Sequence, residues 1–229
     1  VIGLDLSSLG DGTLSVTADI SDLAGNAAMQ ATDTSSKDTA APSISVAIND
    51  GGDRFLNAAE DSSVAISGST SGIPDGQTVS INISSSAGGT PINTTATVNT
   101  NSYSVTGLDL SSLPDGNLAI TADVSDLAGN SATQATDTST KDTASPTISV
   151  AINDGGDGRL NAAEVGAVSI AGTTTGVADG QTVAINISSA GGGTPINTTA
   201  TVNSNSYSVS NLDLSSLADG TLTITADVS

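Results

Sequence analysis

Two acidic loops of the same length carry the side chains most suited to chemistry. They read NDGGDGRLNAAE (153–164) and NDGGDRFLNAAE (49–60), and each ends on one of the only two glutamates, Glu164 and Glu60. An EF-hand calcium loop places oxygen ligands at positions 1, 3, 5, 7 and 9, glycine at 6, an apolar residue at 8 and glutamate at 12. Counted from Asn153, the second loop has Asn, Asp, Gly, Leu, Asn and Glu at positions 1, 5, 6, 8, 9 and 12. The spacing therefore predicts a calcium site.

Two departures from the EF-hand pattern need attention. Position 3 is Gly155, which has no side chain, so Asp154 or a water must supply that oxygen. In the first copy Arg54 replaces the glycine at position 6, where a sharp turn wants positive φ. We expect a related but non-identical loop. The alternative is an acidic turn followed by a helical turn, with both glutamates exposed.

The composition excludes several classes of function. The net charge is −20, with 24 acids against four cations, which argues against nucleic acid and against anionic membrane surfaces. The chain has no His and no Cys, so it lacks the commonest general base and any disulfide. We therefore expect no enzyme. No apolar run of membrane-helix length and no leader opens the chain, so we expect a mature segment or part of a longer protein.

An internal repeat of 104 residues organises the chain. Residues 38–125 and 142–229 are identical at 66 of 88 positions, and residues 3–26 are a further partial copy. This period is too long for a solenoid unit and fits a self-contained domain. We expect three parts. They are the C-terminal part of one repeat (1–37), a complete repeat (38–141) and a repeat lacking its last strand (142–229).

Apolar and polar residues alternate with period two, which predicts β-strands. The predicted strands of one repeat are 43–49, 63–70, 77–84, 95–99, 102–108, 117–125 and a weaker 131–137. Turn residues separate them, and only 56–60 and 110–113 could form a helical turn. Short strands with frequent turns predict an all-β fold of tandem immunoglobulin-like β-sandwich domains in an extended rod.

Further acids gather where one repeat meets the next. Pro42 and Pro146 mark short linkers at 37–43 and 141–147, because proline keeps its predecessor extended. Acids follow the preceding strands and enter the linkers, at Asp19, Asp22, Asp38, Asp123, Asp126 and Asp142. Carboxylates that converge at a joint repel unless a cation bridges them. The alternative is that these residues are turn formers and caps.

At this point the sequence resembles a known family. The run DTxxPxISVAINDGGD, followed by LNAAE and later by ADVSDLAGN, is similar to the bacterial Ig-like extender repeats of giant RTX adhesins, which include ice-binding and biofilm adhesins. The resemblance implies Ca²⁺ within domains and at their joints. It carries the metal role to Asn49, Asp50, Asp53, Asn57, Glu60, Asn153, Asp154, Asp157, Asn161 and Glu164, and to the six joint acids named above.

The resemblance also implies a function. We expect a calcium-rigidified extender, or stalk, of a type I secreted adhesin at the surface of a Gram-negative cell. Its partners would be neighbouring repeats, with no nucleic acid and no membrane insertion by this segment. The alternative is a repeat that itself binds ice or a glycan. We also expect that the ends of an isolated chain could pair head to tail with another copy.

Overall fold

A computed structural model describes residues 2–228, which form 18 strands and no helix. The chain divides into two compact units, Val1–Thr143 and Ala144–Ser229. The predicted all-β class is confirmed. Within the described residues no helix is long and apolar enough to cross a membrane. Because the strands are short and joined by tight turns, each part is a set of antiparallel hairpins.

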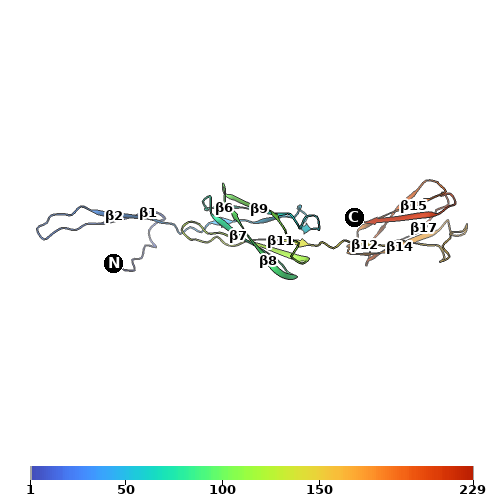
Figure 1. Cartoon of the computed structure of the whole chain (residues 1–229), viewed down its shortest axis with the longest axis horizontal. Helices are drawn as coiled ribbons and strands as arrows, with labels where there is room; N and C mark the ends of the chain where they lie inside the picture. The colour runs from blue at the N-terminus through green and yellow to red at the C-terminus, as the bar shows by residue number, and fades with distance from the viewer. Residues whose placement is uncertain (1, 229) are drawn as a thin grey trace. The chain divides into compact units, whose positions relative to one another are not determined.

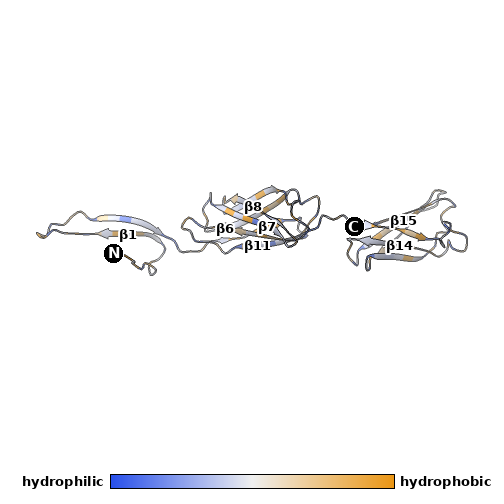
Figure 2. Cartoon of the chain, turned by 60° about the horizontal axis from the view of Figure 1, so that its bottom comes forward, coloured by the Kyte–Doolittle hydropathy of each residue, from blue (hydrophilic) through white to orange (hydrophobic). Residues whose placement is uncertain are grey.

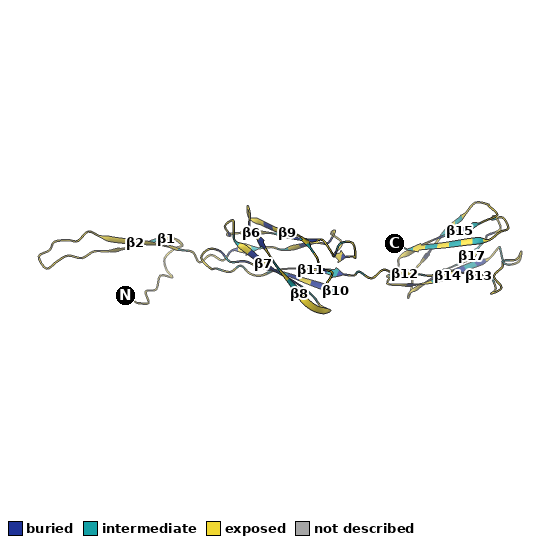
Figure 3. Ribbon diagram, in the orientation of Figure 1, coloured by how far each residue is buried: buried dark blue, intermediate teal, exposed yellow. Residues whose placement is uncertain are grey.

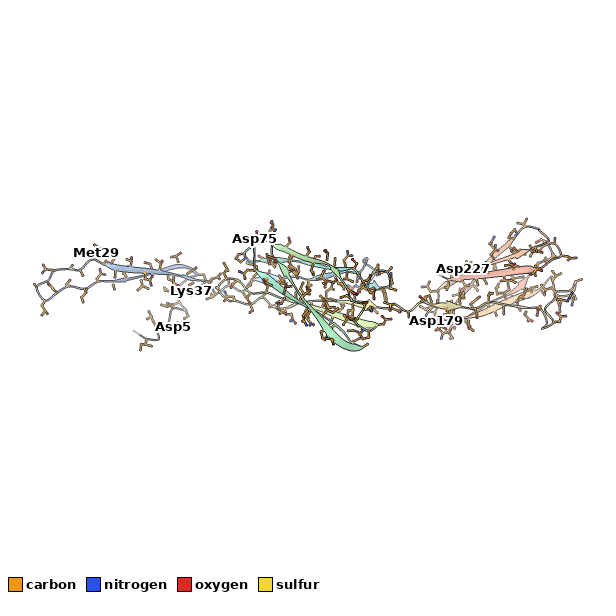
Figure 4. The ribbon with its side chains drawn as sticks, viewed as in Figure 1. Asp5, Met29, Lys37, Asp75, Asp179 and Asp227 are labelled. Carbon is orange, nitrogen blue, oxygen red and sulfur yellow. The ribbon has the colours of Figure 1, made fainter. Side chains whose placement is uncertain are left out.

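The first part of the chain is a β-hairpin, here called the N-terminal hairpin. Strand β1 (Gly12–Ala18) pairs antiparallel with β2 (Ala31–Lys37), from Gly12 opposite Lys37 to Ala18 opposite Ala31 (Figure 1). Its apolar side chains are not covered by a second sheet. Val16 is 66% exposed and Met29, labelled in Figure 4, is 96% exposed.

The middle domain follows in the same unit and is a two-sheet sandwich. One sheet has the order β5-β11-β10-β7-β8, and the other has β3-β6-β4 with β9 also paired to β6. Its strands are β3 (Ser43–Ile44), β4 (Ala47–Asn49), β5 (Phe55–Leu56), β6 (Val64–Ser71), β7 (Thr78–Ser85), β8 (Gly88–Thr97), β9 (Ser102–Leu108), β10 (Gly116–Asp123) and β11 (Ala135–Lys141).

Period-two alternation builds the core of the middle domain. On β10, Leu118, Ile120 and Ala122 are at most 1% exposed, while the residues between them face outward. Apolar residues alternate with polar ones along the strands in Figure 2, and the buried positions follow the same alternation in Figure 3. Valine, isoleucine, leucine and alanine supply nearly all of this core, and small aliphatic side chains suit a thin sandwich.

The C-terminal domain repeats this architecture with fewer strands. One sheet has the order β12-β14-β13 with β17 paired to β14, and the other has β16-β15-β18. Its strands are β12 (Thr147–Ile148), β13 (Ala151–Asn153), β14 (Val168–Thr175), β15 (Thr182–Ser189), β16 (Ile196–Thr201), β17 (Ser206–Leu212) and β18 (Leu222–Val228). Its described residues include no counterpart of β5 or β11.

Three strand predictions need correction. The predicted strand 95–99 is only the end of the longer β8 (Gly88–Thr97), because β8 pairs with β7 along its whole length. The predicted strand 43–49 is broken into β3 and β4, because Ser45 leaves the regular ladder: its carbonyl accepts the hydroxyl of Tyr103 at 2.6 Å. The predicted strand 131–137 begins later, at Ala135. Asp126 closes a tight turn by accepting the N–H of Asn130 at 2.8 Å, and the chain needs several more residues before it regains the sheet. Residues 56–60 form a turn, and no helix follows.

In each domain a buried tyrosine bonds to the backbone at the break between two short strands. The break lies between β3 and β4 in the middle domain and between β12 and β13 in the C-terminal domain. In the C-terminal domain Tyr207 is 3% exposed and donates to the carbonyl of Ser149 at 2.6 Å. Gly172 lies directly beneath this bond. A Cβ there would overlap the Ser149 carbonyl oxygen and lie 2.6 Å from the tyrosine hydroxyl. The glycine is therefore required by close packing.

We predict that Gly172→Ala destabilises the C-terminal domain by about 1–3 kcal/mol, as overpacking of a filled core does. Gly166→Ala is the matched control, because a Cβ at Gly166 meets open space and its φ is not positive. Thermal unfolding followed by circular dichroism compares the two. Equal melting profiles for both variants would contradict the packing argument.

Candidate metal centre and domain joint

The acidic loop of the middle domain, residues 49–60, begins where β4 ends. Gly51 and Gly52 adopt left-handed conformations, with φ of 77° and 89°. Arg54 at position 6 has φ of 69°, close to the 75° of Gly158 at the same place in the second loop. The arginine therefore preserves the backbone turn, although a side chain disfavours that conformation by about 1 kcal/mol or more. The two loops share one backbone path.

Short polar side chains shape both loops from within. In the middle domain one side-chain oxygen of each accepts an N–H two residues ahead: Asn49 from Gly51 (3.4 Å), Asp50 from Gly52 (3.1 Å), Asp53 from Phe55 (2.9 Å) and Asn57 from Ala59 (2.8 Å). In the C-terminal domain the pairs are Asn153 with Gly155, Asp154 with Gly156, Asp157 with Arg159 and Asn161 with Ala163, at 2.8–3.3 Å. Such turns are the ordinary behaviour of these residues.

The glutamate at position 12 reaches back across each loop. Glu60 accepts the N–H of Asn57 at 3.0 Å, and its other oxygen lies 3.3 Å from where a Cβ of Gly51 would be. Glu164 has the same place, 3.1 Å from a Cβ of Gly155. The glycine at position 3 thus has a physical reason: it has positive φ, and a side chain there would crowd the glutamate.

The donor atoms fit a hard cation in type. All are carboxylate, amide or backbone oxygens, which Ca²⁺ prefers. Within residues 2–228, however, no three acidic side chains converge as a ready metal cluster. Asp50 is buried at 7% exposure, while Asp53 and Asn57 are exposed. The loops bring the glutamate over position 3 and leave the other predicted ligands spread along the turn.

The last strand of the middle domain holds the acidic loop in place. On β11, Thr140 donates its N–H to the carbonyl of Arg54 at 2.9 Å, and just beyond it Asp142 donates to Leu56 at 3.0 Å. From the other side, Ile48 donates its N–H to the carboxylate of Asp137 at 2.9 Å. Sequence reasoning missed this role of Asp137, although its recurrence as Asp33 in the hairpin was a visible signal.

The predicted joint acids separate into local caps and a group that lies at one end of the middle domain without converging, among the described residues, as a ready metal cluster. Asp126 accepts both the backbone and the side-chain N–H of Asn130 at 2.8 Å. The same amide donates to the carbonyl of Asp38 in the linker at 3.1 Å. Asp126 and Asp123 also line a shallow depression beside Gln77. The structure thus brings Asp38, Asp123 and Asp126 to one end of the middle domain, where the linker enters.

The remaining joint acids lie elsewhere. In the N-terminal hairpin, Asp22 caps its own turn through Asn26, and Asp19 accepts the side-chain amide of Gln30 at 3.0 Å. Asp142 follows β11 at the end of the middle domain where the chain leaves. Asp22 thus acts as a turn former, whereas Asp19 bonds across the hairpin to Gln30 as Asp123 does to Gln134.

A lysine at the end of β11 fastens the exit of the domain. Lys141 is buried at 4% exposure, donates to the carbonyl of Leu113 at 2.7 Å, and lies 3.2 Å from Asp61 and 3.7 Å from Asp115. Asp115 in turn accepts the N–H of Thr143 at 3.0 Å. That backbone hydrogen bond is the main reason why the pKa of Asp115 is lowered.

The N-terminal hairpin has the same arrangement of a lysine and an aspartate at the end of its last strand. Lys37, labelled in Figure 4, donates to the carbonyl of Leu9 at 2.8 Å and to Asp11 at 2.9 Å, and Asp11 accepts the N–H of Thr39 at 3.0 Å. This arrangement was missed by sequence reasoning. The signal was that two of the four cations recur at the same place in successive repeats.

Part of this sequence is similar to a known protein family. Residues 101–214 match the family of bacterial Ig-like domains (group 3). This match covers 114 of the 229 residues and identifies the segment 101–214 as bacterial Ig-like. A comparison with curated proteins gives no match. The family match confirms the bacterial Ig-like resemblance that the sequence predicts.

Three solved adhesin structures are similar to this bacterial Ig-like chain. A tetra-tandem repeat from the extending region of a large adhesion protein is 32% identical over 100% of the chain, with a TM-score of 0.45. A Ca²⁺-stabilized adhesin with which an Antarctic bacterium binds ice is 30% identical over 96% (TM-score 0.41), and a 1.5-MDa bacterial ice-binding adhesin is 25% identical over 96% (0.41). The chain spans 55%, 56% and 74% of their lengths.

The Asp126 cap predicts a pH dependence for the bacterial Ig-like fold. The side-chain amide of Asn130 lowers the pKa of Asp126 from 3.8. A lowered folded-state pKa gives stability that is present above about pH 4 and is lost as pH falls further. Asp126→Asn should therefore destabilise the middle domain at pH 7, and its difference from wild type should shrink between pH 5 and about pH 3, measured by urea unfolding. Asp22→Asn removes the same cap in the exposed hairpin and should leave this transition unchanged.

The buried lysine predicts a double-mutant cycle. Lys141→Met leaves Asp61 buried without its cation and should destabilise the middle domain by about 3 kcal/mol. Val165 occupies the position of Asp61 in the second repeat, so Asp61→Val is a compatible replacement. The double variant should recover most of the loss in urea unfolding. A double variant as unstable as Lys141→Met alone would show that the pair is not what stabilises this end.

Proposed function

We propose that this chain is a stalk segment of a large bacterial cell-surface adhesin, extracellular, whose tandem domains act as spacers stiffened by Ca²⁺. The observation that carries the proposal is the path of the chain through the middle domain. It enters beside the β10–β11 turn, where Asn130 contacts Asp38. It leaves at the opposite end of the same hairpin, where Asp115 holds Thr143.

Entry and exit are therefore separated by the length of β10. Eight residues of strand span about 25 Å, so each complete domain advances the chain by roughly that distance. Residues 38–125 and 142–229 are identical at 66 of 88 positions, so a complete second domain would repeat the same step. In such a domain the chain enters at one end and leaves at the other. Repeating the domain therefore lengthens the protein, and the number of copies sets the length of the stalk. The adhesin extending region at 32% identity points the same way.

Calcium is the proposed stiffening agent. The residues that would hold it are those of the two acidic loops, with Glu60 and Glu164 folded over position 3, and at the joint Asp38, Asp123 and Asp126, which would have to draw closer around the cation. A bound divalent cation would supply neutralising charge to a protein of net charge −20. One relative is described as Ca²⁺-stabilized. Extracellular modules bind calcium at about 10⁻⁴–10⁻³ M.

Direct ligand binding by the repeat has less support. Glycan sites usually offer an exposed aromatic platform, and the only two tyrosines, Tyr103 and Tyr207, are both 3% exposed. Phe55 is 54% exposed but stands where the second repeat has Arg159. The two domains share their strand arrangement and their aliphatic core, and neither shows an exposed aromatic site that recurs in both. This supports a role as a spacer.

We predict that 5 mM CaCl₂ stabilises each loop-bearing domain by about 1–2 kcal/mol relative to excess EGTA, from binding at about 10⁻⁴–10⁻³ M. The melting temperature should rise by about 5–15 °C. The variant Glu60→Gln/Glu164→Gln should lose this shift. The control Asp109→Asn/Asp213→Asn changes the net charge equally and should keep the shift. It lies in other turns, where these aspartates accept the N–H of Ser111 and Ser215.

Equal losses in both double variants would mean general charge screening and would remove the loop sites from the proposal. Small-angle scattering of the same samples tests the stalk. The maximum dimension of the chain should be larger and better defined with calcium than with EGTA. A calcium-induced melting shift without any change in scattering would leave calcium as a stabiliser and would contradict its role in stiffness.

A further inference from the structure

The two segments of the middle domain that lie next to its linkers run side by side in the same direction. β4 leads from the entry end of the domain toward the acidic loop. β11 starts beyond the turn at Asn130 and ends at Lys141, where the chain leaves. The short strand β5, which follows β4 in the loop, pairs parallel with β11, and Lys141 lies opposite Leu56. The first and last segments of the domain are therefore neighbours.

Three hydrogen bonds join these segments directly. Ile48 on β4 donates its N–H to the carboxylate of Asp137 at 2.9 Å. The N–H groups of Thr140 and Asp142 donate to carbonyls of the segment 54–56, at 2.9 and 3.0 Å. Hydrogen bonds between neighbouring strands run across the strand direction. When the chain is pulled at both linkers, β4 is drawn toward the entry end and β11 toward the exit end, so the three bonds are loaded in shear and at the same time.

Two charged side chains of β11 prevent the strand from sliding past its neighbours. Asp137 is bound to β4, and the buried Lys141 donates to the carbonyl of Leu113 at 2.7 Å and lies 3.2 Å from Asp61. A slip of one residue would turn both charges to the opposite face of the strand. A slip of two residues toward the exit would carry Asp137 to the place of Ser139, which is 4% exposed, and a buried charge without a partner is unfavourable. The strand therefore moves under load only by breaking its anchors and its backbone bonds together.

The same three bonds also connect the two sheets of the sandwich. β4 belongs to the sheet of β6, and β11 belongs to the sheet of β10. Neither strand can leave its own sheet while it is still bonded to the other. Any route by which tension at the linkers opens the domain must therefore break these bonds first.

The acidic loop lies in the direct path of the load. Tension that enters β4 crosses the loop to β5 and passes from there to β11. Within the loop Asp50 and Asp53 each accept an N–H two residues ahead, at 3.1 and 2.9 Å, and the fully buried Leu56 fixes its far end. A short, internally hydrogen-bonded link distributes tension between the contact at Asp137 and the two bonds of the segment 54–56.

We propose that the segment Ile48–Leu56 and β11 form a mechanical clamp, whose three hydrogen bonds determine how long the middle domain stays folded when the chain is pulled at both linkers. Residues 61–134 stay folded until the clamp breaks. The acidic loop then bears force in addition to any role in cation binding. The biological use of the clamp rests on the stalk proposal, because a spacer at a cell surface is pulled at both ends, but the clamp itself is a property of the domain.

The absence of cysteine lets tension be applied at chosen residues of the full chain. In one variant Ala41→Cys and Ser145→Cys, at exposed residues that flank the middle domain, carry DNA handles for optical tweezers. In a second variant the handles are at Ala87→Cys and Ala128→Cys, in the exposed β7–β8 and β10–β11 turns, so that β4, the loop and β11 bear no load. The lifetime of the folded domain is measured at constant force in EGTA, which makes the result independent of calcium.

Asp137→Ala removes one clamp bond. With handles at 41 and 145 it should shorten the lifetime about tenfold, because its bond is broken in the transition state for forced unfolding. The matched control is Asp75→Ala, labelled in Figure 4 as Asp75, which removes an aspartate that accepts the N–H of Thr100 at 2.7 Å outside the clamp. Its bond is intact in that transition state, so the lifetime should stay within about twofold of wild type. With handles at 87 and 128, Asp137→Ala should also stay within about twofold.

Three results would overturn the clamp. They are equal shortening by Asp137→Ala and Asp75→Ala, no shortening by Asp137→Ala, and the same shortening by Asp137→Ala at both pairs of handles. Asp137→Asn keeps the shape of the side chain and an oxygen acceptor, and it carries the same comparison, with a smaller shortening, if the alanine variant does not fold. Because the force measurement is made without calcium, it can fail while the scattering test of the stalk succeeds, and the reverse.

Discussion

The pairing of β11 with β10 is the interaction on which the middle domain depends. This strand covers the edge where Leu118 and Ile120 enter the core, and it carries three hydrogen bonds that hold the acidic loop and β4. Its last residue, Lys141, binds the turn at Asp115 and continues into the linker. One strand thus connects the core, the candidate metal loop and the exit of the chain. The sheet that contains β18 has the same strand arrangement without that strand. There the apolar residues of β18 are only half-buried, and so is Leu160.

This closing strand is polar on the side that faces inward. Asp137, Ser139 and Lys141 take positions where a sandwich normally places aliphatic residues. Burying a charge is unfavourable unless it is hydrogen-bonded or paired, so the strand is stable only where its partners are present. Asp137 and Lys141 have theirs, whereas the hydroxyl of Ser139 has no hydrogen-bond partner among residues 2–228. Inward-pointing charges also discourage pairing with unrelated edges. The strand is therefore selective, and its attachment relies less on hydrophobic burial than that of the other strands.

The sequence predicts the part of the fold that depends on neighbours along the chain. Strands such as 102–108 were predicted at their observed bounds because alternation and turn residues are local signals. β5 could not be predicted, since two residues become a strand only when β11 arrives from 85 positions away. Among the candidate ligands, the spacing identified Glu60 as the residue that folds over the loop. It could not identify Asp137 and Lys141, because their partners are backbone groups brought close only by the sandwich.

The two acidic loops differ in where their charges lie and in the strand that covers the first of them. The backbone turn is conserved although Arg54 takes the place of Gly158, and Asp61 takes the place of Val165. Each change alone would alter the local field, since a cation opposes binding of calcium and a buried acid favours it. In the middle domain Asp61 is already neutralised by Lys141 at 3.2 Å, so the acid does not offset the arginine at the loop. The loop at 153–164 has its arginine one position later, at Arg159, so each loop carries three acids and one arginine and the two differ in where the positive charge lies. The loop at 49–60 draws more of its order from β11. The two loops thus have similar backbone turns, although the position of the arginine and the pairing with a neighbouring strand differ between them.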